Sequence, residues 1–457
     1  MNNLRPWAVL ALTSLALLLD RTVFAASTDT LNWRTNQNRV TADIKSSELR
    51  LVLEKIALVT GWKVYVEPET FHLVSTKFEN LPPGDALHHL LGDVNFALIP
   101  ANVTNASSKL FVFRTTMQKA TQLIHAAGLD GDHSPKVMPN ELVVRLKPGQ
   151  KIEDLARLLG AKVIGQIDSL NAYRLKFDDQ AATDAAREQL ATNPNVASVE
   201  DNQMIDRPTT PQPLASTSMG PPQLQLKTPP ETGRVIIGLV DTAVQTLGNG
   251  LDSFLLKAQS AVAESTIDPN SPTHGTGMAE TILRSLEATT KGGTSVQILP
   301  VNVYGSGETT STFDVANGIV LAYNGGAQVI NLSLGSEGDS QTLRDLIQQL
   351  SSKGIVFFAA KGNQPVTNPF YPAADPGVTP VTALDNGQLA SYANRADIPS
   401  VGAPGTSVIY FDGKAYYVMG TSVSTAYVSG MAAGYMDTAH KSATDAQTFI
   451  LNKLTVK

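Results

Sequence analysis

The chain has 457 residues, which is more than one ordinary domain holds and suggests about two to four domains. Its apolar fraction of 42% and charged fraction of 17% are typical of a globular protein with real cores. The net charge of −6 and the lack of any basic run argue against a nucleic-acid partner, and the absence of cysteine excludes disulfides, thiolate metal sites and cysteine nucleophiles.

Residues 1–25 have the pattern of a secretory signal peptide. Arg5 supplies the positive start, residues 7–19 form an apolar run, and residues 23–25 have the small-residue spacing of a cleavage site. An uncleaved anchor would need about 20 apolar residues to cross a bilayer, and the charged pair at 20–21 ends this run first. We therefore predict export to the periplasm or the medium, with no stable membrane anchor after cleavage.

Residues 30–116 predict a small α/β domain in the order strand, helix, strand, strand, helix, strand, strand. Apolar residues recur at helical spacing over 49–60, and the sequence Pro-Pro-Gly at 82–84 begins a second helix. His88 and His89 on that helix point about 100° apart, so we expect a solvated pair rather than a chelate.

Two segments of this domain, LRLVLEKIALVTGWKVYV and LPPGDALHHLLGDVNFAL, resemble the short N-terminal domain of secretins and TonB-dependent transducers. The resemblance implies a secretin or TonB-type envelope partner that binds residues 30–116. Hydrophobic patterning alone implies only a small α/β domain with no assigned role.

Three further segments lie before residue 231. Residues 117–135 are polar and contain two glycines and a proline, which predicts a linker. Residues 136–207 follow the order β-α-β-β-α-β of a ferredoxin-like fold, with one helix at 152–159. Residues 208–230 contain seven prolines and predict an extended, exposed linker that is easily cut.

Residues 231–457 predict an α/β domain with a doubly wound parallel sheet, and four polar residues stand where such folds build sites. Asp241 ends the apolar run RVIIGLV, and Asn363 ends the strand pattern of GIVFFAAKGN. His274 stands in PTHGTG at the first turn of a helix, and Ser422 begins a helix of small residues. Taken singly, these residues have plain structural alternatives: a salt-bridge partner, a turn, a structural histidine and a helix N-cap.

The four residues occur in the order Asp, His, Asn, Ser, which is the chain order of subtilisin rather than of chymotrypsin or the α/β-hydrolases. The segments IIGLVDTAV, HGTGMAE, VINLSLGS, FFAAKGN and GTSVSTAYVSG resemble the signature segments of the subtilisin family. The resemblance implies a subtilisin-like α/β fold preceded by two small α/β domains.

The resemblance also implies a role for each residue. His274 would accept the proton of Ser422 as general base, and Asp241 would orient the imidazole. Asn363 and the backbone N–H of Ser422 would form the oxyanion hole. The chemistry would be peptide-bond hydrolysis through an acyl-enzyme.

Substrate would bind by strand addition between two edges. One edge is implied at Ser333, Leu334 and Gly335, and the opposite edge near Gly305, Ser306 and Gly307. The chemistry requires neither a metal nor an organic cofactor. Calcium often stabilises relatives, but the chain has no ligand loop to which structural calcium can be assigned.

The segment VASVEDNQMI, which ends residues 136–207, resembles the propeptide of subtilisin-like enzymes and implies a zymogen. The chain departs from the family pattern at Ala243, where Gly is usual, and at Ser424 and Ala426, where Ala and Pro are usual. The loop 364–372 is also shorter, and these departures bear on the specificity pocket and the level of activity.

We therefore predict an exported serine endopeptidase that acts on protein or peptide substrates. The alternative is a catalytically weak or inactive envelope adaptor, in which residues 30–116 dock a secretin or TonB-type partner and the protease fold is a relic.

Overall fold

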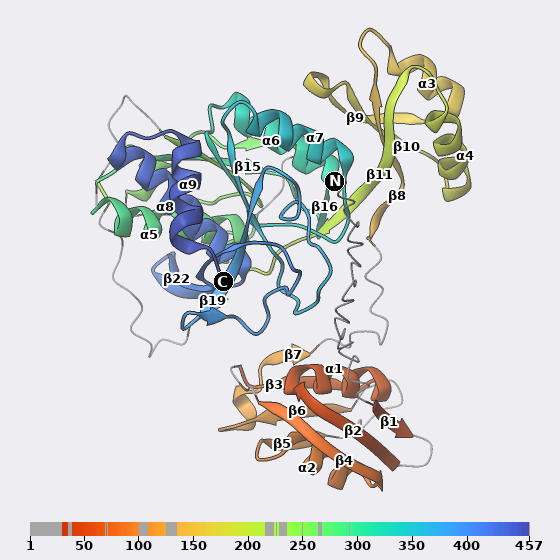
Figure 1. The fold of residues 1–457 in the computed structure, drawn as a ribbon, viewed down its shortest axis with the longest axis vertical. Helices are drawn as coiled ribbons and strands as arrows, with labels where there is room; N and C mark the ends of the chain where they lie inside the picture. The colour runs from red at the N-terminus through yellow and green to blue at the C-terminus, as the bar shows by residue number, and fades with distance from the viewer. Residues whose placement is uncertain are drawn as a thin grey trace, which may run out of the picture. The chain divides into compact units, whose positions relative to one another are not determined.

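The structure is a computed structural model of the chain. It describes residues 30–34, 39–68, 70, 72–99, 108–124, 135–214, 224, 226–227, 235–248, 250–263, 267–291 and 293–456. The predicted signal peptide and most of the predicted linkers lie outside these residues. The chain forms two compact units, Met1–Asp132 and His133–Lys457, which are described separately (Figure 1).

The first unit contains two small sheets and two helices that enclose one core. A three-stranded antiparallel sheet has the order β1-β2-β4, and a four-stranded mixed sheet has the order β5-β6-β3-β7. The elements are β1 (Thr30–Arg34), β2 (Arg39–Glu48), α1 (Leu49–Thr60), β3 (Lys63–Val66), β4 (Leu73–Leu81), α2 (Pro83–Leu91), β5 (Asn95–Ile99), β6 (Lys109–Phe113), η1 (Met117–Lys119) and β7 (Gln122–Ile124).

The two helices begin where the sequence predicted, but two other predictions for this unit were wrong. Two strands, not one, precede α1, and they pair as an antiparallel hairpin in which Trp33 lies opposite Val40. The predicted linker 117–135 begins too early, because β7 pairs with β3 and buries Ile124 in the core. A three-residue strand is too short to show an alternating pattern, so its place is decided by the partner strand.

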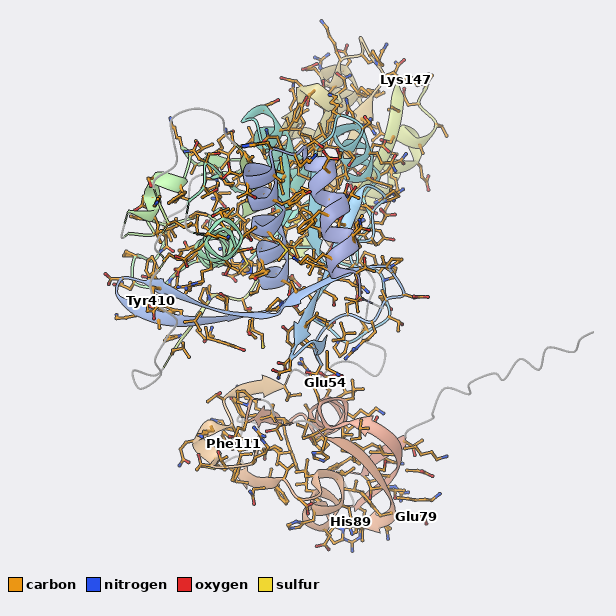
Figure 2. All side chains as sticks on the ribbon, turned by 60° about the vertical axis from the view of Figure 1, so that its left-hand side comes forward. Glu54, Glu79, His89, Phe111, Lys147 and Tyr410 are labelled. Atoms are coloured by element: carbon orange, nitrogen blue, oxygen red, sulfur yellow. The ribbon has the colours of Figure 1, made fainter. Side chains whose placement is uncertain are left out.

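His88 and His89 are exposed on α2 and contact different aromatic rings. The His88 ring lies edge-on to Phe96 at a centroid distance of 4.9 Å, and His89, labelled in Figure 2, lies 5.5 Å from Phe78. The two imidazoles therefore diverge.

The second unit begins with a small α/β layer of the predicted β-α-β-β-α-β order. Its elements are β8 (Val137–Leu146), α3 (Ile152–Leu159), β9 (Lys162–Ile167), η2 (Asp168–Leu170), β10 (Ala172–Lys176), α4 (Gln180–Ala191) and β11 (Val196–Asp206). The sheet order is β16-β11-β8-β10-β9. The long strand β11 therefore also pairs, in antiparallel direction, with β16 (Thr309–Ser311), a strand of the larger layer (Figure 1). This pairing joins the two layers through the backbone.

The larger layer is the predicted doubly wound α/β fold. Its sheet has the order β14-β15-β13-β17-β18-β19-β20, with β21 also paired to β19, and every pairing except β19–β20 is parallel. The strands are β13 (Ile236–Asp241), β14 (Gln259–Ser260), β15 (Gln297–Asn302), β17 (Val329–Leu332), β18 (Val356–Ala360), β19 (Val378–Asp385), β20 (Gln388–Leu389) and β21 (Val401–Pro404). The helices are η3 (Leu251–Phe254), α5 (His274–Thr290), α6 (Thr312–Asn324), α7 (Gln341–Ser351), α8 (Thr421–Ala439) and α9 (Ala443–Leu454).

Alternating side chains of the sheet supply two cores. In β13, Ile237 and Leu239 pack with α5, α8 and α9, whereas Val240 packs on the opposite face with α6 and α7. The small layer contributes to this second core, for example through Ile205 of β11. A hairpin of β22 (Thr406–Phe411) and β23 (Lys414–Met419) pairs with the short β12 (Gln212–Pro213). Within the part of the chain that the structure describes, no helix has the length and apolarity needed to span a bilayer.

Candidate active site

Two strand ends place the site at the carboxyl edge of the parallel sheet. Asp241 is the last residue of β13, and Ser333 directly follows β17. The register pairs Val240 with Leu332, so the next residues, Asp241 and Ser333, lie level at strand ends about 4.8 Å apart. The buried Asp241 carboxylate accepts a hydrogen bond from the backbone N–H of Thr242 at 2.6 Å.

His274, the first residue of α5, lies against this carboxylate. Its Nδ1 is 2.8 Å from Oδ1 and 3.0 Å from Oδ2 of Asp241, and only 5% of the residue is exposed. Because a carboxylate only accepts hydrogen bonds, Nδ1 holds the proton of the neutral imidazole. Nε2 is then left as an acceptor. The N-cap Thr273 fixes the helix start by accepting from the N–H of Thr276.

Gly275 explains why the start of α5 can approach the end of β13 so closely. Its N–H donates to the Thr242 hydroxyl at 2.8 Å, and a Cβ at this position would lie 2.2 Å from the Thr242 carbonyl oxygen. A side chain here would push the helix, and His274 with it, away from Asp241.

Ser422 is the second residue of α8, and Ser333 binds it at both backbone and side chain. The Ser422 hydroxyl donates to the Ser333 carbonyl at 3.0 Å, and the Ser333 hydroxyl donates to the Ser422 carbonyl at 2.9 Å. Since Ser333 lies level with Asp241, these bonds place Ser422 at the same carboxyl edge of the sheet as Asp241. The hydroxyl proton points to Ser333 here, so transfer to His274 requires a rotation of the Ser422 side chain.

Asn363 is exposed and follows β18 on the other side of Ser422. Its Oδ1 accepts from the backbone N–H of Thr421 at 2.8 Å and from the Thr421 hydroxyl at 2.9 Å. The N–H donor fixes which end of the amide is oxygen, and leaves the Nδ2 protons for another acceptor. Gly420, with φ of 139°, gives this amide room, because a Cβ there would lie 2.9 Å from Nδ2.

The two segments predicted as substrate edges differ in backbone structure. Ser333, Leu334 and Gly335 extend β17 beside Ser422. Gly305, Ser306 and Gly307 form a turn, with a left-handed φ of 57° at Gly305. The strand β16 begins two residues after this turn. The β-branched pair Thr309-Thr310 was the sequence signal for this strand.

The sequence comparisons agree with this geometry. The model of the subtilase family matches residues 232–456. Thermitase from Thermoactinomyces vulgaris is 30% identical over 222 residues, which cover 47% of this chain and 79% of thermitase. The chain belongs to the subtilase family. It is a subtilisin-like serine endopeptidase.

Other similarities extend beyond the larger layer of this subtilase, which contains Asp241, His274 and Ser422 and is called the catalytic layer from here on. The model of the fervidolysin N-terminal prodomain matches residues 126–202. The thermophilic serine proteinase of Bacillus sp. (strain AK1) is 28% identical over 340 residues, which cover 68% of this chain and 84% of that protein. The crystal structure of fervidolysin from Fervidobacterium pennivorans has the same fold, with a TM-score of 0.53, 19% identity and coverage of 68% of this chain and 56% of fervidolysin.

The small layer of the subtilase caps two helices of the catalytic layer. The Glu200 carboxylate accepts from the backbone N–H groups of Gln341 and Thr342, at 2.6 and 3.2 Å, at the start of α7. Asn202 Oδ1 accepts from the N–H of Phe313 at 3.2 Å, at the start of α6. Oxygen acceptors satisfy the free N–H groups of helix N-termini, so these contacts stabilise the joined layers.

A buried ion-pair cluster lies beside these caps. Arg174 of the small layer binds Glu141 at 2.7 Å and Asp314 of α6 at 3.0 Å. Burial raises the pKa of Asp314, and the Arg174 guanidinium acts in the opposite direction. Asp314 therefore depends on the small layer for its counter-charge.

Arg207, which the sequence analysis did not single out, holds the end of β11 on the catalytic layer. Its guanidinium donates to the carbonyls of Gly305 and Gly307, both at 2.7 Å, and lies 5.4 Å from the Tyr304 ring centroid. The Tyr304 hydroxyl donates to the Asp206 carbonyl at 3.2 Å. Burial raises the pKa of Tyr304 well above its ordinary value, which keeps this hydroxyl a donor.

Residues 208–211, here called the crossing segment, lead from β11 to β12, and Thr209 and Thr210 in this segment are exposed. Pro211 is buried, and its Cγ would lie 3.2 Å from a Cβ at Gly277, one turn after His274 on α5. Gln212 and Pro213 pair with Tyr417 and Tyr416 of β23. Proline tolerates this position because β12 is an edge strand.

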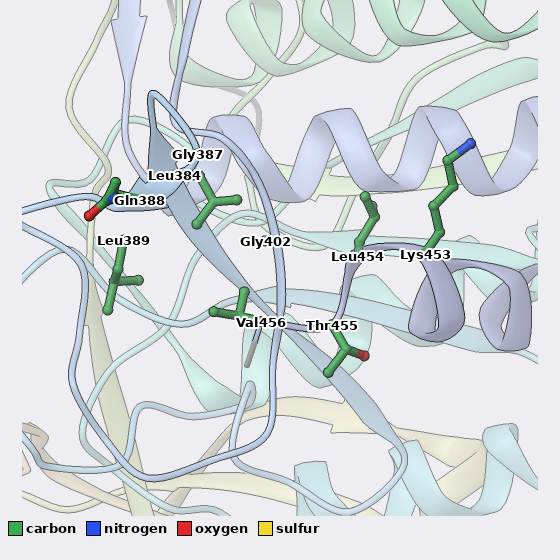
Figure 3. A pocket seen from close by; sticks show the side chains of 9 residues that line it. All are labelled: Leu384, Gly387, Gln388, Leu389, Gly402, Lys453, Leu454, Thr455 and Val456. Atoms are coloured by element: carbon green, nitrogen blue, oxygen red, sulfur yellow. The ribbon is translucent and has the colours of Figure 1, made fainter.

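A surface pocket of about 530 Å³ lies elsewhere on the catalytic layer (Figure 3). It is lined mainly by the β19–β20 hairpin and by the end of α9 with the two residues that follow it, and none of the predicted site residues belongs to it. Among the described residues, no three His, Cys, Asp or Glu side chains gather in a way that could hold a metal ion.

Proposed function

We propose that the subtilase cuts protein substrates with Ser422 as nucleophile, His274 as general base and Asp241 as the group that orients His274. The observation that supports this most directly is the contact of His274 Nδ1 with both oxygens of the buried Asp241. It fixes the tautomer in which Nε2 can take the Ser422 proton.

In the first half of the reaction, Ser422 Oγ attacks the substrate carbonyl carbon and its proton passes to His274 Nε2. The negative charge that develops on the carbonyl oxygen is bound by Asn363 Nδ2 and the Ser422 N–H, at the N-terminus of α8. His274 then gives its proton to the leaving amine. Water repeats the sequence on the acyl-enzyme and releases the acid.

The substrate backbone would add as a strand along Ser333, Leu334 and Gly335 on one side and β16 on the other. The N–H and carbonyl groups of β16 are paired with Met204, Ile205 and Asp206 of β11 in this chain. This supports a zymogen, in which residues 136–207 cover the cleft until the crossing segment is cut.

We further propose that the chain is exported by its signal peptide and that the first unit binds a secretin or TonB-type envelope partner. Both proposals rest on the sequence patterns of residues 1–25 and 30–116.

The triad is tested with a fluorophosphonate serine probe and casein hydrolysis. The wild-type protein should be labelled at Ser422, and Ser422→Ala, His274→Ala and Asp241→Asn should each lose about 10⁴-fold or more in kcat, with effects that do not add. Ser424→Ala is the matched control, because Ser424 is a buried serine of the same helix whose hydroxyl donates to Ala403 and Pro404 carbonyls. Casein hydrolysis by Ser422→Ala at the wild-type rate would exclude the assignment, and no labelling would favour the inactive adaptor.

A further inference from the structure

Two glycines face each other at the ends of neighbouring strands, beside the nucleophile. The register of β17 and β18 pairs Leu332 with Ala359. Three residues further on, this register brings Gly335 level with Gly362. Gly335 is two residues from the Ser333 carbonyl that binds Ser422, and Gly362 directly precedes Asn363. The slot between the glycines therefore lies next to both groups that would contact the reacting carbonyl.

The ring of Phe370 occupies this slot. A Cβ built on Gly335 would lie 2.6 Å from Cε1 of Phe370, and a Cβ built on Gly362 would lie 3.1 Å from its Cγ. The ring is thus packed against both glycine backbones, at positions where no side chain could fit.

The backbone on both sides of Phe370 is held in place. Tyr371 and Ser336 exchange two backbone hydrogen bonds, of 2.9 and 2.7 Å. Asn394 donates from its side chain to the Asn368 carbonyl at 2.9 Å and from its N–H to the Gly362 carbonyl at 3.1 Å. These contacts fix the backbone from which the Phe370 ring enters the slot.

The substrate side chain that precedes the cut bond must enter this region. The attacked carbonyl carbon lies about 3 Å from Ser422 Oγ, and the side chain in question is attached to the Cα bonded to that carbon. With the substrate backbone along Ser333–Gly335, it points between the two glycines. We propose that Phe370 closes this slot, so that the subtilase cuts after glycine, alanine, serine or threonine and rejects large apolar side chains. The proposal rests on the proposed function and names its substrate class.

The chain's own crossing segment is consistent with this selectivity. Arg207 is held by Gly305 and Gly307 on one side of the site, and Gln212 pairs with Tyr417 on the other. The four residues between them are Pro, Thr, Thr and Pro. A cut after any of these four residues follows proline or threonine, neither of which has a large side chain. Arg207, which precedes them, is anchored to the Gly305 and Gly307 carbonyls.

The test compares peptides that differ only in the residue before the cut bond, with alanine, leucine or phenylalanine there. The full chain is expressed, and the concentration of active enzyme is taken from fluorophosphonate labelling. We expect wild-type kcat/KM for alanine to exceed that for phenylalanine at least 10-fold. Phe370→Ala should raise kcat/KM for phenylalanine by about 10- to 100-fold, because the lost ring frees a pocket of similar size, and should change the value for alanine little.

Phe449→Ala is the matched control. Phe449 is a half-buried phenylalanine of α9 that stacks on Tyr435 at 4.2 Å, and Tyr435 is about 20 Å along α8 from Ser422. This variant should leave the ratio of phenylalanine to alanine unchanged.

Wild-type enzyme that cuts after phenylalanine or leucine as well as after alanine would overturn the proposal. An unchanged ratio in an active Phe370→Ala enzyme would also overturn it. If Phe370→Ala does not fold, the ratio of kcat/KM for phenylalanine to that for alanine is compared between Phe370→Leu and wild type instead. Labelled enzyme with the wrong profile refutes this proposal alone, whereas no labelling and no cleavage refute the proposed function and this inference with it.

Discussion

The amide of Asn363 is the exposed polar group of the site, and one neighbour, Thr421, sets its orientation. Its Nδ2 protons should bind the substrate oxygen most strongly when that oxygen becomes negative. We therefore expect Asn363→Ala to lower kcat by about 10²- to 10³-fold and to change KM little. Steady-state kinetics on one peptide would show this. A rise in KM at constant kcat would instead assign Asn363 to ground-state binding.

A second residue-scale feature, Asp375, lies outside the catalytic groups. Its carboxylate is 3% exposed, makes no hydrogen bond to the described residues, and has Arg344 Nε at 3.5 Å. Burial, and then the charge of Asp339, raises the pKa of Asp375 to about 7. The folded protein therefore binds this proton more tightly than the unfolded chain does.

This difference predicts how stability depends on pH. Between about pH 4 and pH 7 the unfolded state has lost the proton of Asp375 and the folded state keeps it, so the contribution of Asp375 to stability falls as pH rises. Asp375→Asn should therefore raise Tm at pH 8 relative to wild type, and raise it much less at pH 4.5. Melting curves in a Ser422→Ala background avoid self-digestion, and Asp385→Asn, an exposed control, should show no such pH-dependent gain. An equal effect of Asp375→Asn at both pH values would contradict the linkage.

At the scale of elements, the site depends on the contact between the end of β13 and the start of α5. Gly275→Ala would place a methyl group 2.2 Å from the Thr242 carbonyl oxygen, so the helix start must shift. We expect a loss of at least 10²-fold in kcat/KM, because small displacements of a catalytic group are costly, together with a lower Tm. Gly293→Ala is the control, since a Cβ there would meet no atom within 4 Å. Full activity of Gly275→Ala would show that the contact does not position His274.

Elements also explain which predictions from the sequence succeeded. α1, α3 and α5 have long periodic patterns or clear start signals, and the structure has them at the predicted places. β7 and β16, of three residues each, exist because a partner strand is available. Residue preference can favour such a strand, as the β-branched pair Thr309-Thr310 does, but local pattern does not place it, since its hydrogen bonds go to distant residues.

At the scale of the whole molecule, one polypeptide passes from β11 of the small layer through residues 207–211 to β12. β11 pairs with β16 on one side of Ser422, and β12 pairs with β23 on the other. This arrangement supports cutting of the segment between Arg207 and Gln212 by the enzyme itself. It also supports inhibition before the cut, because Met204–Asp206 pair with β16, the strand that we propose as a substrate edge.

Expression of Ser422→Ala should accumulate an uncut chain that starts near Ala26, whereas wild type should yield a fragment that starts between Thr209 and Gln212. N-terminal sequencing and intact mass would identify both. Ser424→Ala should be processed like wild type. Identical processing of Ser422→Ala and wild type would show that another protease makes the cut, and full activity of the uncut chain would exclude inhibition by residues 136–207.

The sequence by itself determined the fold class, the helix starts and the four polar residues at strand ends and helix starts, because each depends on neighbours within a few positions. Only the tertiary structure decided which of these residues meet. Ser333 and Ser422 are 89 residues apart, and the register of β13 and β17 places Ser333 level with Asp241. The ring of Phe370 lies between two glycines on different strands, and a glycine in a sequence does not show which side chain faces it. Such contacts arise from long-range pairing and packing, which leave no periodic signal along the chain.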